Sequence, residues 1–189
     1  GFALKKDGSL WTWGTNVYSG KNSDANFHDL IFATKMTLPS TVTGIKMIQA
    51  TAVGYNNYHT YYLLDTKNTL YCLGFNSYGE FGFKTYPIMK VWTPSQYPNG
   101  SITNDISWIS SNEHDLYFPN LAIINKNGTV YGAGSNAGFA LGQSTNYGAH
   151  YFKIPNGIST TDIITTFEVG GHCSEEKKKG TARYGYVGH

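Results

Sequence analysis

The chain has 189 residues and a formal net charge of +2, and its aromatic share of 15% slightly exceeds its charged share of 14%. This length supports one ordinary domain, and the composition excludes a disordered chain, which needs low hydrophobicity and high charge. The weak charge gives no indication of a nucleic-acid partner, because phosphate binding needs clustered Lys and Arg. The sequence has no run of about 18 apolar residues, so we expect no membrane span.

Three β-hairpins are predicted along the chain, and the second arm of each is followed directly by a glycine and, two residues after that glycine, by an asparagine. The paired arms are residues 2–5 with 10–13, 61–65 with 70–73, and 121–124 with 130–133. These arms are rich in β-branched and aromatic residues, as strands are. Their turns carry Gly8, Asn68 and Gly128, residue types that tolerate the positive φ of a tight turn.

A fixed period links these hairpins. The closing glycines, Gly14, Gly74 and Gly134, are spaced by 60 residues, and a fixed period is the mark of a repeat architecture. Strand-like stretches also recur on both sides of a proline that lies between the hairpins. They are residues 32–37, 89–93 and 151–154 before the proline, and 45–48, 106–109 and 163–167 after it. Four short strands per period predict an all-β fold, a β-propeller of four-stranded antiparallel blades, with a linear solenoid as the alternative.

The second arm of each hairpin and the Gly-x-Asn after it form a repeated phrase, and the second copy of this phrase resembles the repeat of a known family. Residues 70–82 read Leu-Tyr-Cys-Leu-Gly-Phe-Asn-Ser-Tyr-Gly-Glu-Phe-Gly, which resembles the repeat of the regulator of chromosome condensation family. The third copy, residues 134–142, repeats the Gly-x-Asn, and we expect one extra residue in its tail. The first copy lacks the Gly-x-x-Gly tail that ends the second copy, and it continues into a long loop over residues 18–30. The resemblance implies a seven-bladed β-propeller.

The repeat also predicts how the chain is divided. We expect residues 1–189 to be a segment of a single propeller domain, an incomplete ring of about three blades. The segment would hold the end of one blade, two full repeats near 32–82 and 89–142, and the start of the next from residue 151. Bare blade faces expose apolar surface, so we expect the rest of the same propeller or neighbouring chains to cover them.

Candidate catalytic and metal-binding groups are sparse. The densest polar cluster, Glu-His-Asp at residues 113–115, has no nucleophile or second carboxylate in a recognisable motif. His59 and His172 recur loosely in phase with it but on different blades, so we interpret them as structural. Cys72 is interpreted as a small apolar strand residue, since the two cysteines lack the spacing of a metal site. We therefore predict no catalytic residue, no metal site and no cofactor.

Two further polar features are interpreted as turn chemistry. Asn16, Asn76 and Asn136 could form a ring of amides around a pore, or each could cap the backbone of its own turn. Their recurrence in every repeat favours capping. The cationic run at residues 177–179 directly follows two glutamates, which favours a solvated turn.

Binding is expected at aromatic residues in the predicted loops, two of which break the repeat. Tyr gives a large contact area at low entropy cost, and the chain has 15 of them. The candidate binding residues are Tyr18, Tyr55, Tyr58, Tyr78, Tyr117 and Phe118. The alternative is that such rings pack between blades.

Taken together, these features predict a non-enzymatic propeller module that acts as a protein-interaction or ligand-binding scaffold. We expect it to belong to a larger secreted or cell-surface protein, with a cytoplasmic location as the alternative. A structural subunit of an adhesin, tail fibre or secretion complex is a second reading, and the family resemblance adds a guanine-nucleotide exchange factor-like regulator. A glycosidase or lyase propeller would need carboxylates that converge on an axial channel.

Overall fold

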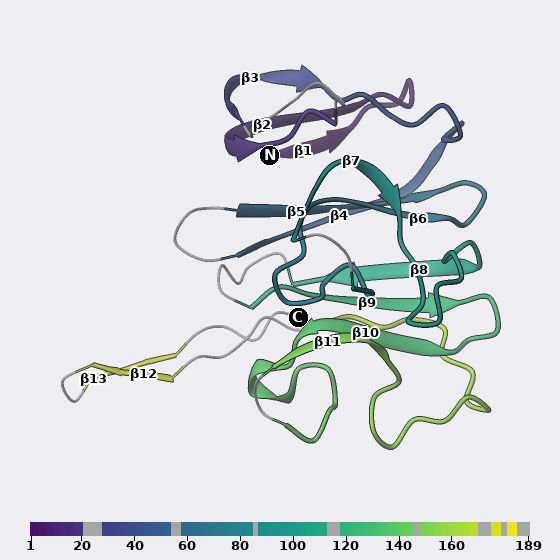
Figure 1. The fold of residues 1–189 in the computed structure, drawn as a ribbon, viewed down its shortest axis with the longest axis vertical. Coiled ribbons are helices and arrows are strands. Elements are labelled where there is room, and N and C mark those ends of the chain that lie inside the picture. The colour runs from purple at the N-terminus through teal and green to yellow at the C-terminus, as the bar shows by residue number, and fades with distance from the viewer. Residues whose placement is uncertain are drawn as a thin grey trace.

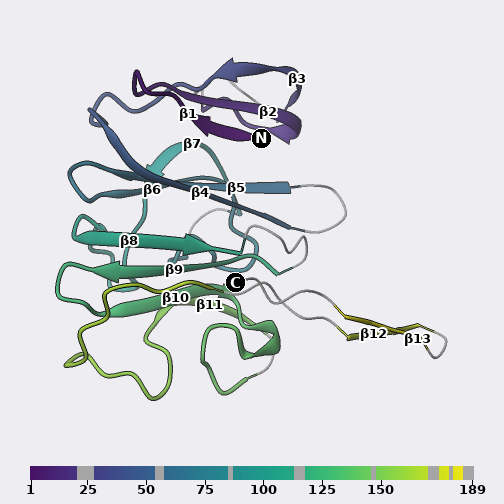
Figure 2. The same cartoon turned by 180° about the vertical axis from the view of Figure 1, so that it is seen from behind.

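The computed structural model describes residues 1–20, 28–53, 58–84, 87–112, 118–145, 148–169, 175–178 and 181–184. Strands and turns make up nearly all of this part, with one short 3₁₀ helix, η1 (Ala137–Phe139). Three antiparallel sheets stack face to face as layers (Figure 1), and the view from behind shows the same layering (Figure 2). The predicted all-β propeller architecture is confirmed, and its three blades form an arc that does not close into a ring.

Each of the three sheets is one blade. The first blade holds, in order, β1 (Phe2–Leu4), β2 (Leu10–Val17) and β3 (His28–Lys35). The second holds β4 (Ile45–Val53), β5 (Tyr58–Asp65), β6 (Leu70–Phe75) and β7 (Ile88–Pro94). The third holds β8 (Ile106–Ser111), β9 (Asn120–Asn125), β10 (Val130–Ser135) and β11 (Ala149–Lys153). A separate hairpin pairs β12 (Glu175–Lys178) with β13 (Thr181–Tyr184).

The blades begin at a different point of the period than the predicted repeats. The second blade spans residues 45–94 and the third 106–153, whereas the sequence divides into repeats near 32–82 and 89–142. The segment before each proline pairs with the hairpin that precedes it, as β7 pairs with β6. A repeat can be cut at any phase of the sequence, and strand pairing alone decides which strands share a sheet.

The second blade is buried on both faces. Along β5, Tyr61 and Leu63 join an apolar cluster shared with the first blade, while Tyr62 and Leu64 join one shared with the third. Successive side chains of a strand point to opposite faces, so a continuous apolar run marks a strand that is covered twice. Cys72 on β6 is a fully buried free thiol in the second of these clusters, which confirms its interpretation as an apolar strand residue.

The closing glycines are required by the backbone around them. Gly74 has a φ of +103°, and a Cβ on it would lie 2.1 Å from the carbonyl oxygen of His59. Gly134 has a φ of +101°, and its Cβ would lie 2.4 Å from the carbonyl oxygen of Pro119. A left-handed φ and a close neighbouring strand both exclude a side chain. Both glycines lie where the pairing with the outer strand shifts register, so the period of the sequence reproduces one bulge in successive blades.

The asparagines that follow these glycines cap turns, as predicted. The Oδ1 of Asn76 accepts a hydrogen bond from the N–H of Phe81 at 2.9 Å. The Oδ1 of Asn136 accepts one from the N–H of Leu141, also at 2.9 Å. The same side chain therefore closes the same turn in two blades. The side chain of Asn16 lies outside the described residues.

The predicted extra residue in the third copy is wrong. Phe139 stands 60 residues after Gly79 and takes its place, with a φ of +61° against +75°. Both residues donate their N–H to the carbonyl of the preceding asparagine, at 2.9 Å and 3.2 Å respectively. The two tails are therefore equal in length, and a side chain occupies a left-handed position that costs an L-residue about 1 kcal/mol.

Two predictions for the C-terminal part are also wrong. Residues 163–167 do not form a strand, because no neighbour among the described residues supplies a ladder for them. The segment still lies beside β8, where Trp108 donates its indole N–H to the carbonyl of Phe167 at 2.9 Å. Lys177 and Lys178 of the cationic run, predicted to lie in a solvated turn, belong to strand β12, whose backbone pairs with β13, and Lys179 lies outside the described residues.

Candidate binding site

The hairpin turn of the third blade forms one wall of the site. The Oδ1 of Asn125 accepts hydrogen bonds from the N–H groups of Asn127 at 3.0 Å and Thr129 at 2.9 Å. Asp65 makes the same pair of contacts 60 residues earlier in the second blade. A side-chain acceptor of this kind satisfies backbone donors within a tight turn. The turn therefore fixes the position of Asn125 at the edge of the site.

The connection between β7 and β8 forms the opposite wall. It folds back in a turn in which the N–H of Gly100 donates to the carbonyl of Tyr97 at 2.8 Å. Pro98 presets the φ that this turn requires. The Oδ1 of Asn99 accepts hydrogen bonds from the N–H and the hydroxyl of Ser101, at 2.9 Å and 2.7 Å. These local bonds hold Tyr97 in place before any ligand arrives.

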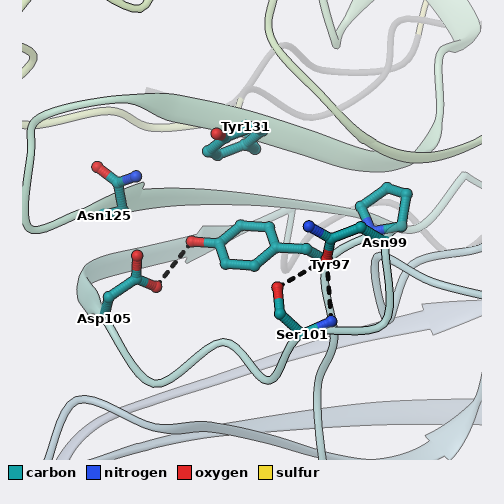
Figure 3. A pocket seen from close by; sticks show the side chains of 7 residues that line it. Tyr97, Asn99, Ser101, Asp105, Asn125 and Tyr131 are labelled. Atoms are coloured by element: carbon teal, nitrogen blue, oxygen red, sulfur yellow. Dashed lines mark hydrogen bonds between the residues drawn. The ribbon is translucent and has the colours of Figure 1, made fainter.

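A pocket of about 460 Å³ opens between these walls (Figure 3). It is lined by Tyr97, Pro98, Asn99, Ser101, Asp105, Asn125 and Tyr131. The rings of Tyr97 and Tyr131 are inclined at 59° with their centroids 5.4 Å apart, and Phe152 packs near both. This volume is within the range of small-ligand sites, which combine apolar walls with a few fixed polar groups.

Asp105 supplies the charge of this pocket. Its Oδ1 accepts a hydrogen bond from the hydroxyl of Tyr97 at 2.7 Å. Burial raises the pKa of Tyr97, and the hydrogen bond to Asp105 and the carboxylate charge raise that pKa further. Burial and the same charge also raise the pKa of Tyr131. Both phenols are therefore neutral near pH 7, and the lining carries one negative charge.

The equivalent corner between the first and second blades is filled. Tyr71, which stands 60 residues before Tyr131, is only 5% exposed. Its hydroxyl is hydrogen bonded to the hydroxyl of Thr41 at 2.9 Å, and Lys67 donates to the carbonyl of Thr41 at 3.1 Å. Tyr131 is half-buried instead, beside the pocket. The pocket thus exists where the connection between blades departs from the repeat.

A smaller cavity of about 330 Å³ lies between the first two blades. It is lined by Gly20, Thr37, Leu38, Pro39, Val91 and Trp92. The indole N–H of Trp92 is buried there, and no hydrogen-bond partner for it is found in the described part of the chain. The lining has a donor but no charged group, so the pocket around Tyr97 is the stronger candidate for binding.

None of the predicted binding residues whose side chains the structure describes lines the pocket. Tyr18, at the start of the loop predicted over residues 18–30, is only 2% exposed and packs in the cluster between the first two blades. Tyr78 and Phe118 are half-buried and lie elsewhere. Tyr55, Tyr117 and the side chain of Tyr58 lie outside the described residues. The binding role of these six residues stays a prediction.

The residues that line the pocket carry weak sequence signals. Tyr97 falls in a predicted loop, and Tyr97-Pro98-Asn99-Gly100 is a turn signature that could have indicated a shaped tip there. Tyr131 belongs to the repeated phrase and looks like a core residue. Asp105 has no sequence signal, because only folding brings its carboxylate to the Tyr97 hydroxyl.

His59, interpreted from the sequence as structural, lies between two blades. The Nε2 of His59 lies 3.0 Å from the carbonyl oxygen of Thr15, across the first two blades, and burial lowers the pKa of His59. Residues 113–115 and His172 lie outside the described part. Within the described ranges, no three His, Cys, Asp or Glu side chains gather as a metal site would need. No helix in those ranges is long and apolar enough to cross a membrane.

Three solved structures are similar to this fold. Yeast RCC1 (Prp20), solved with Kap60 bound to it, matches at a TM-score of 0.54 and 20% identity over 82% of this chain and 35% of its own. Human WBSCR16 matches at a TM-score of 0.54 and 17% identity, over 81% and 36%. Prp20p from Saccharomyces cerevisiae matches at 0.51 and 20%, over 82% and 36%. No protein-family model and no curated protein matches the chain.

These matches establish the architecture. The chain spans about a third of the length of the structures it resembles, and at 17–20% identity the likeness shows the fold alone. The repeated phrase, the bulge at its closing glycine and the stacked blades all agree with it. The resemblance noted in the sequence is confirmed at this level: the chain folds as about three blades of an RCC1-like β-propeller.

Proposed function

We propose that this chain is a non-enzymatic propeller module that binds another protein, as part of a larger protein. The observation that carries the proposal is the RCC1-like fold. One of the similar proteins is solved in a complex with Kap60, and the other yeast structure is described together with its binding to Gsp1p and histones. Stacked blades of this kind form a rigid support from which loops can present binding groups.

The pocket between the second and third blades supports a protein partner. Its aromatic walls are held by local hydrogen bonds, and such preorganised Tyr side chains give contact area at low entropy cost. The net charge of +2 favours a protein over a nucleic acid. A secreted or cell-surface location is part of the proposal on composition alone, and cell fractionation with an antibody against the chain tests it.

A structural role in a larger assembly is the second candidate. Ile31 is 86% and Phe32 77% exposed on β3, at the outer side of the first blade. Large apolar side chains at a blade edge favour coverage by the rest of the same propeller or by neighbouring chains. An exchange factor-like regulator is a third candidate, and stimulated release of labelled GDP from a small GTPase tests it.

Photo-crosslinking from two exposed positions tests the binding proposal. A benzophenone amino acid is placed at Ser101 on the pocket rim and, as a matched control, at Thr161 on another exposed loop. We expect a discrete crosslinked protein from Ser101 and not from Thr161 when the chain is incubated with extract of its native source. The same products from both positions, or none from Ser101, contradict a partner at this site. Crosslinks from both to a single large complex favour an assembly subunit.

A further inference from the structure

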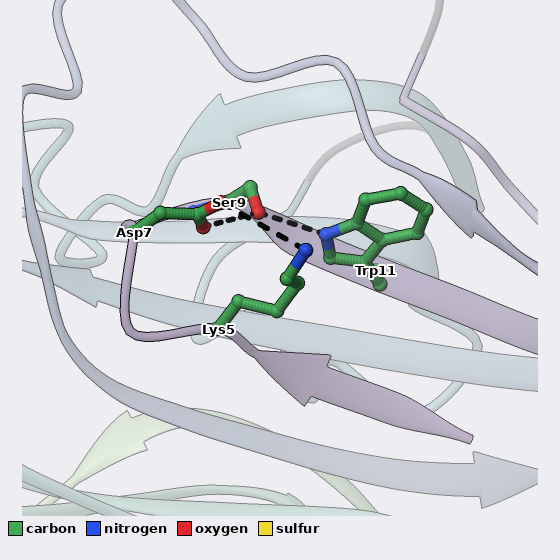
Figure 4. A network of polar contacts seen from close by, with 4 residues as sticks. All are labelled: Lys5, Asp7, Ser9 and Trp11. Atoms are coloured by element: carbon green, nitrogen blue, oxygen red, sulfur yellow. Dashed lines mark hydrogen bonds and ion pairs between the residues drawn. The ribbon is translucent and has the colours of Figure 1, made fainter.

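The first repeat already holds a cation at the position that corresponds to the pocket. The Nζ of Lys5 lies 4.9 Å from the ring centroid of Trp11 and 3.8 Å from the carboxylate of Asp7 (Figure 4). The indole N–H of Trp11 donates to the hydroxyl of Ser9 at 2.8 Å, and that hydroxyl donates to Asp7 at 2.5 Å. An ammonium group over an aromatic face beside a carboxylate is an attractive arrangement.

The third repeat keeps the aromatic ring and lacks the cation. Trp11 and Tyr131 stand 120 residues apart, at the same position of the period, and so do Lys5 and Asn125. The amide of Asn125 is neutral and is held by its own turn. The pocket lies beside Tyr131, so the corner that holds an ammonium group in the first repeat is open in the third.

In the third repeat, the carboxylate beside the ring comes from a different segment than Asp7 does in the first repeat. Asp105, in the connection between blades, lines the pocket with Tyr131 and accepts the hydrogen bond of Tyr97. A hydrogen bond from the phenol to an anion increases the electron density of the Tyr97 ring. The ring then attracts a cation more strongly. One carboxylate oxygen is engaged by Tyr97, and a carboxylate has a second oxygen that can accept from an ammonium group. Ring faces, negative charge and open volume therefore meet at one place.

We propose that this pocket binds the ammonium group of a lysine side chain presented by the protein partner. The inference rests on the proposed function, since a protein supplies the lysine. The ammonium group contacts the faces of Tyr97 and Tyr131 and donates to the carboxylate of Asp105. The methylene stem of the lysine runs along the ring of Tyr131, as long cationic side chains do on apolar surface.

Titration with a blocked lysine tests the pocket without knowledge of the partner. The probe is N-acetyl-lysine methylamide, and its matched control is the same compound with an acetylated side chain. Nitrogen-15 NMR of the full chain follows the backbone amides of Ser101, Lys126 and Tyr131. We expect saturable shifts of these amides with the charged probe in the millimolar range, and none with the acetylated control.

Two variants separate the charge from the ring. Asp105→Asn keeps the acceptor for Tyr97 but removes the charge, and we expect it to weaken binding about five- to tenfold. Tyr131→Leu removes one aromatic face and should weaken binding about fivefold, whereas Tyr131→Phe keeps the face and should change it less than about twofold. Chemical-shift dispersion checks that each variant is folded. If Tyr131→Leu is unfolded, the result for Asp105→Asn alone decides whether the pocket binds the ammonium group.

The outcomes distinguish this inference from the proposed function. Equal binding of the charged probe by the wild type and Asp105→Asn overturns the inference, and so does the absence of any shift. Shifts with a neutral sugar such as xylose that exceed those with lysine overturn it in favour of a carbohydrate site. The crosslinking experiment at Ser101 is read independently. A partner captured there whose binding survives Asp105→Asn leaves the proposed function intact and refutes the lysine pocket.

Discussion

The corner between the first and second blades and the corner between the second and third are built from the same repeated parts. Each has a hairpin turn capped by a side-chain oxygen, Asp65 in one and Asn125 in the other, and each has a tyrosine from the repeated phrase. The first corner buries Tyr71 against Thr41, while the second leaves Tyr131 half-buried beside a pocket of about 460 Å³. The repeat thus builds the scaffold, and the connection between blades decides whether a corner is core or surface.

Truncation of the two tyrosines gives the largest expected effect on this comparison. We expect Tyr71→Ala to lower the free energy of unfolding by about 3–5 kcal/mol, because it leaves a cavity in a filled corner. Tyr131→Ala should cost about half as much, since the ring is partly solvated already. Urea unfolding at one pH measures both. Equal losses would show that the two corners do not differ in packing.

Glu80 gives the second prediction, because the third blade has Ala140 in its place. Glu80 is fully buried, its carboxylate accepts from the N–H of Tyr78 at 2.7 Å, and burial raises its pKa to about 8. The folded state therefore holds a proton that the unfolded state has released, so stability falls as pH rises from about 4.5 to 8 and is level above. We expect Glu80→Gln to unfold with the same free energy as the wild type near pH 4, and to exceed it by about 5 kcal/mol above pH 8, since each pKa unit is worth about 1.4 kcal/mol.

Urea unfolding across pH 4 to 9 measures that difference. Asp105→Asn is the matched control, because Asp105 is a partly exposed carboxylate at the pocket rather than a buried one. A constant difference between Glu80→Gln and the wild type at every pH would contradict a buried, neutral carboxyl.

Transplanting the first repeat into the third gives a prediction of intermediate size. Asn125→Lys should place an ammonium group in the pocket beside Tyr131, as Lys5 lies over Trp11. We expect this variant to lose about 1 kcal/mol from the missing turn cap and to bind the blocked lysine at least tenfold more weakly. Asn125→Asp keeps the cap and adds a negative charge, so it should bind the probe more tightly. Tighter binding by Asn125→Lys would show that the pocket does not hold a cation.

The smallest expected effect concerns the tails of the two phrases. Phe139 is 53% exposed and adopts the left-handed φ that Gly79 adopts in the second blade. Phe139→Gly should raise the free energy of unfolding by about 0.5–1 kcal/mol, because it relieves backbone strain at little cost in burial. Ala140→Gly is the control and should lower stability, since Ala140 has an ordinary φ of −56°. Thermal unfolding of both variants measures these changes. A lower unfolding midpoint for Phe139→Gly than for the wild type would mean that contacts of the Phe139 ring stabilise the fold by more than the backbone strain costs.

Much of the fold could be predicted because its signals are local. Gly74 marks a left-handed bulge, Asn68 a positive-φ turn and Asn76 a capped loop, and each does so through chemistry within a few residues of itself. The candidate site could not be predicted in this way. Tyr18 looked like a loop aromatic and is buried in the core, while Tyr131 looked like a core residue and lines the pocket.

The sequence by itself determined the all-β repeat, its period and the side chains that close each turn, since these depend on φ angles and hydrogen bonds between near neighbours. The tertiary structure alone decided where each blade begins, which tyrosines are buried, and that Asp105 meets Tyr97 from another part of the same connection. These features depend on how a connection folds back over the next blade. Two corners with the same repeated residues therefore became a closed core and an open pocket.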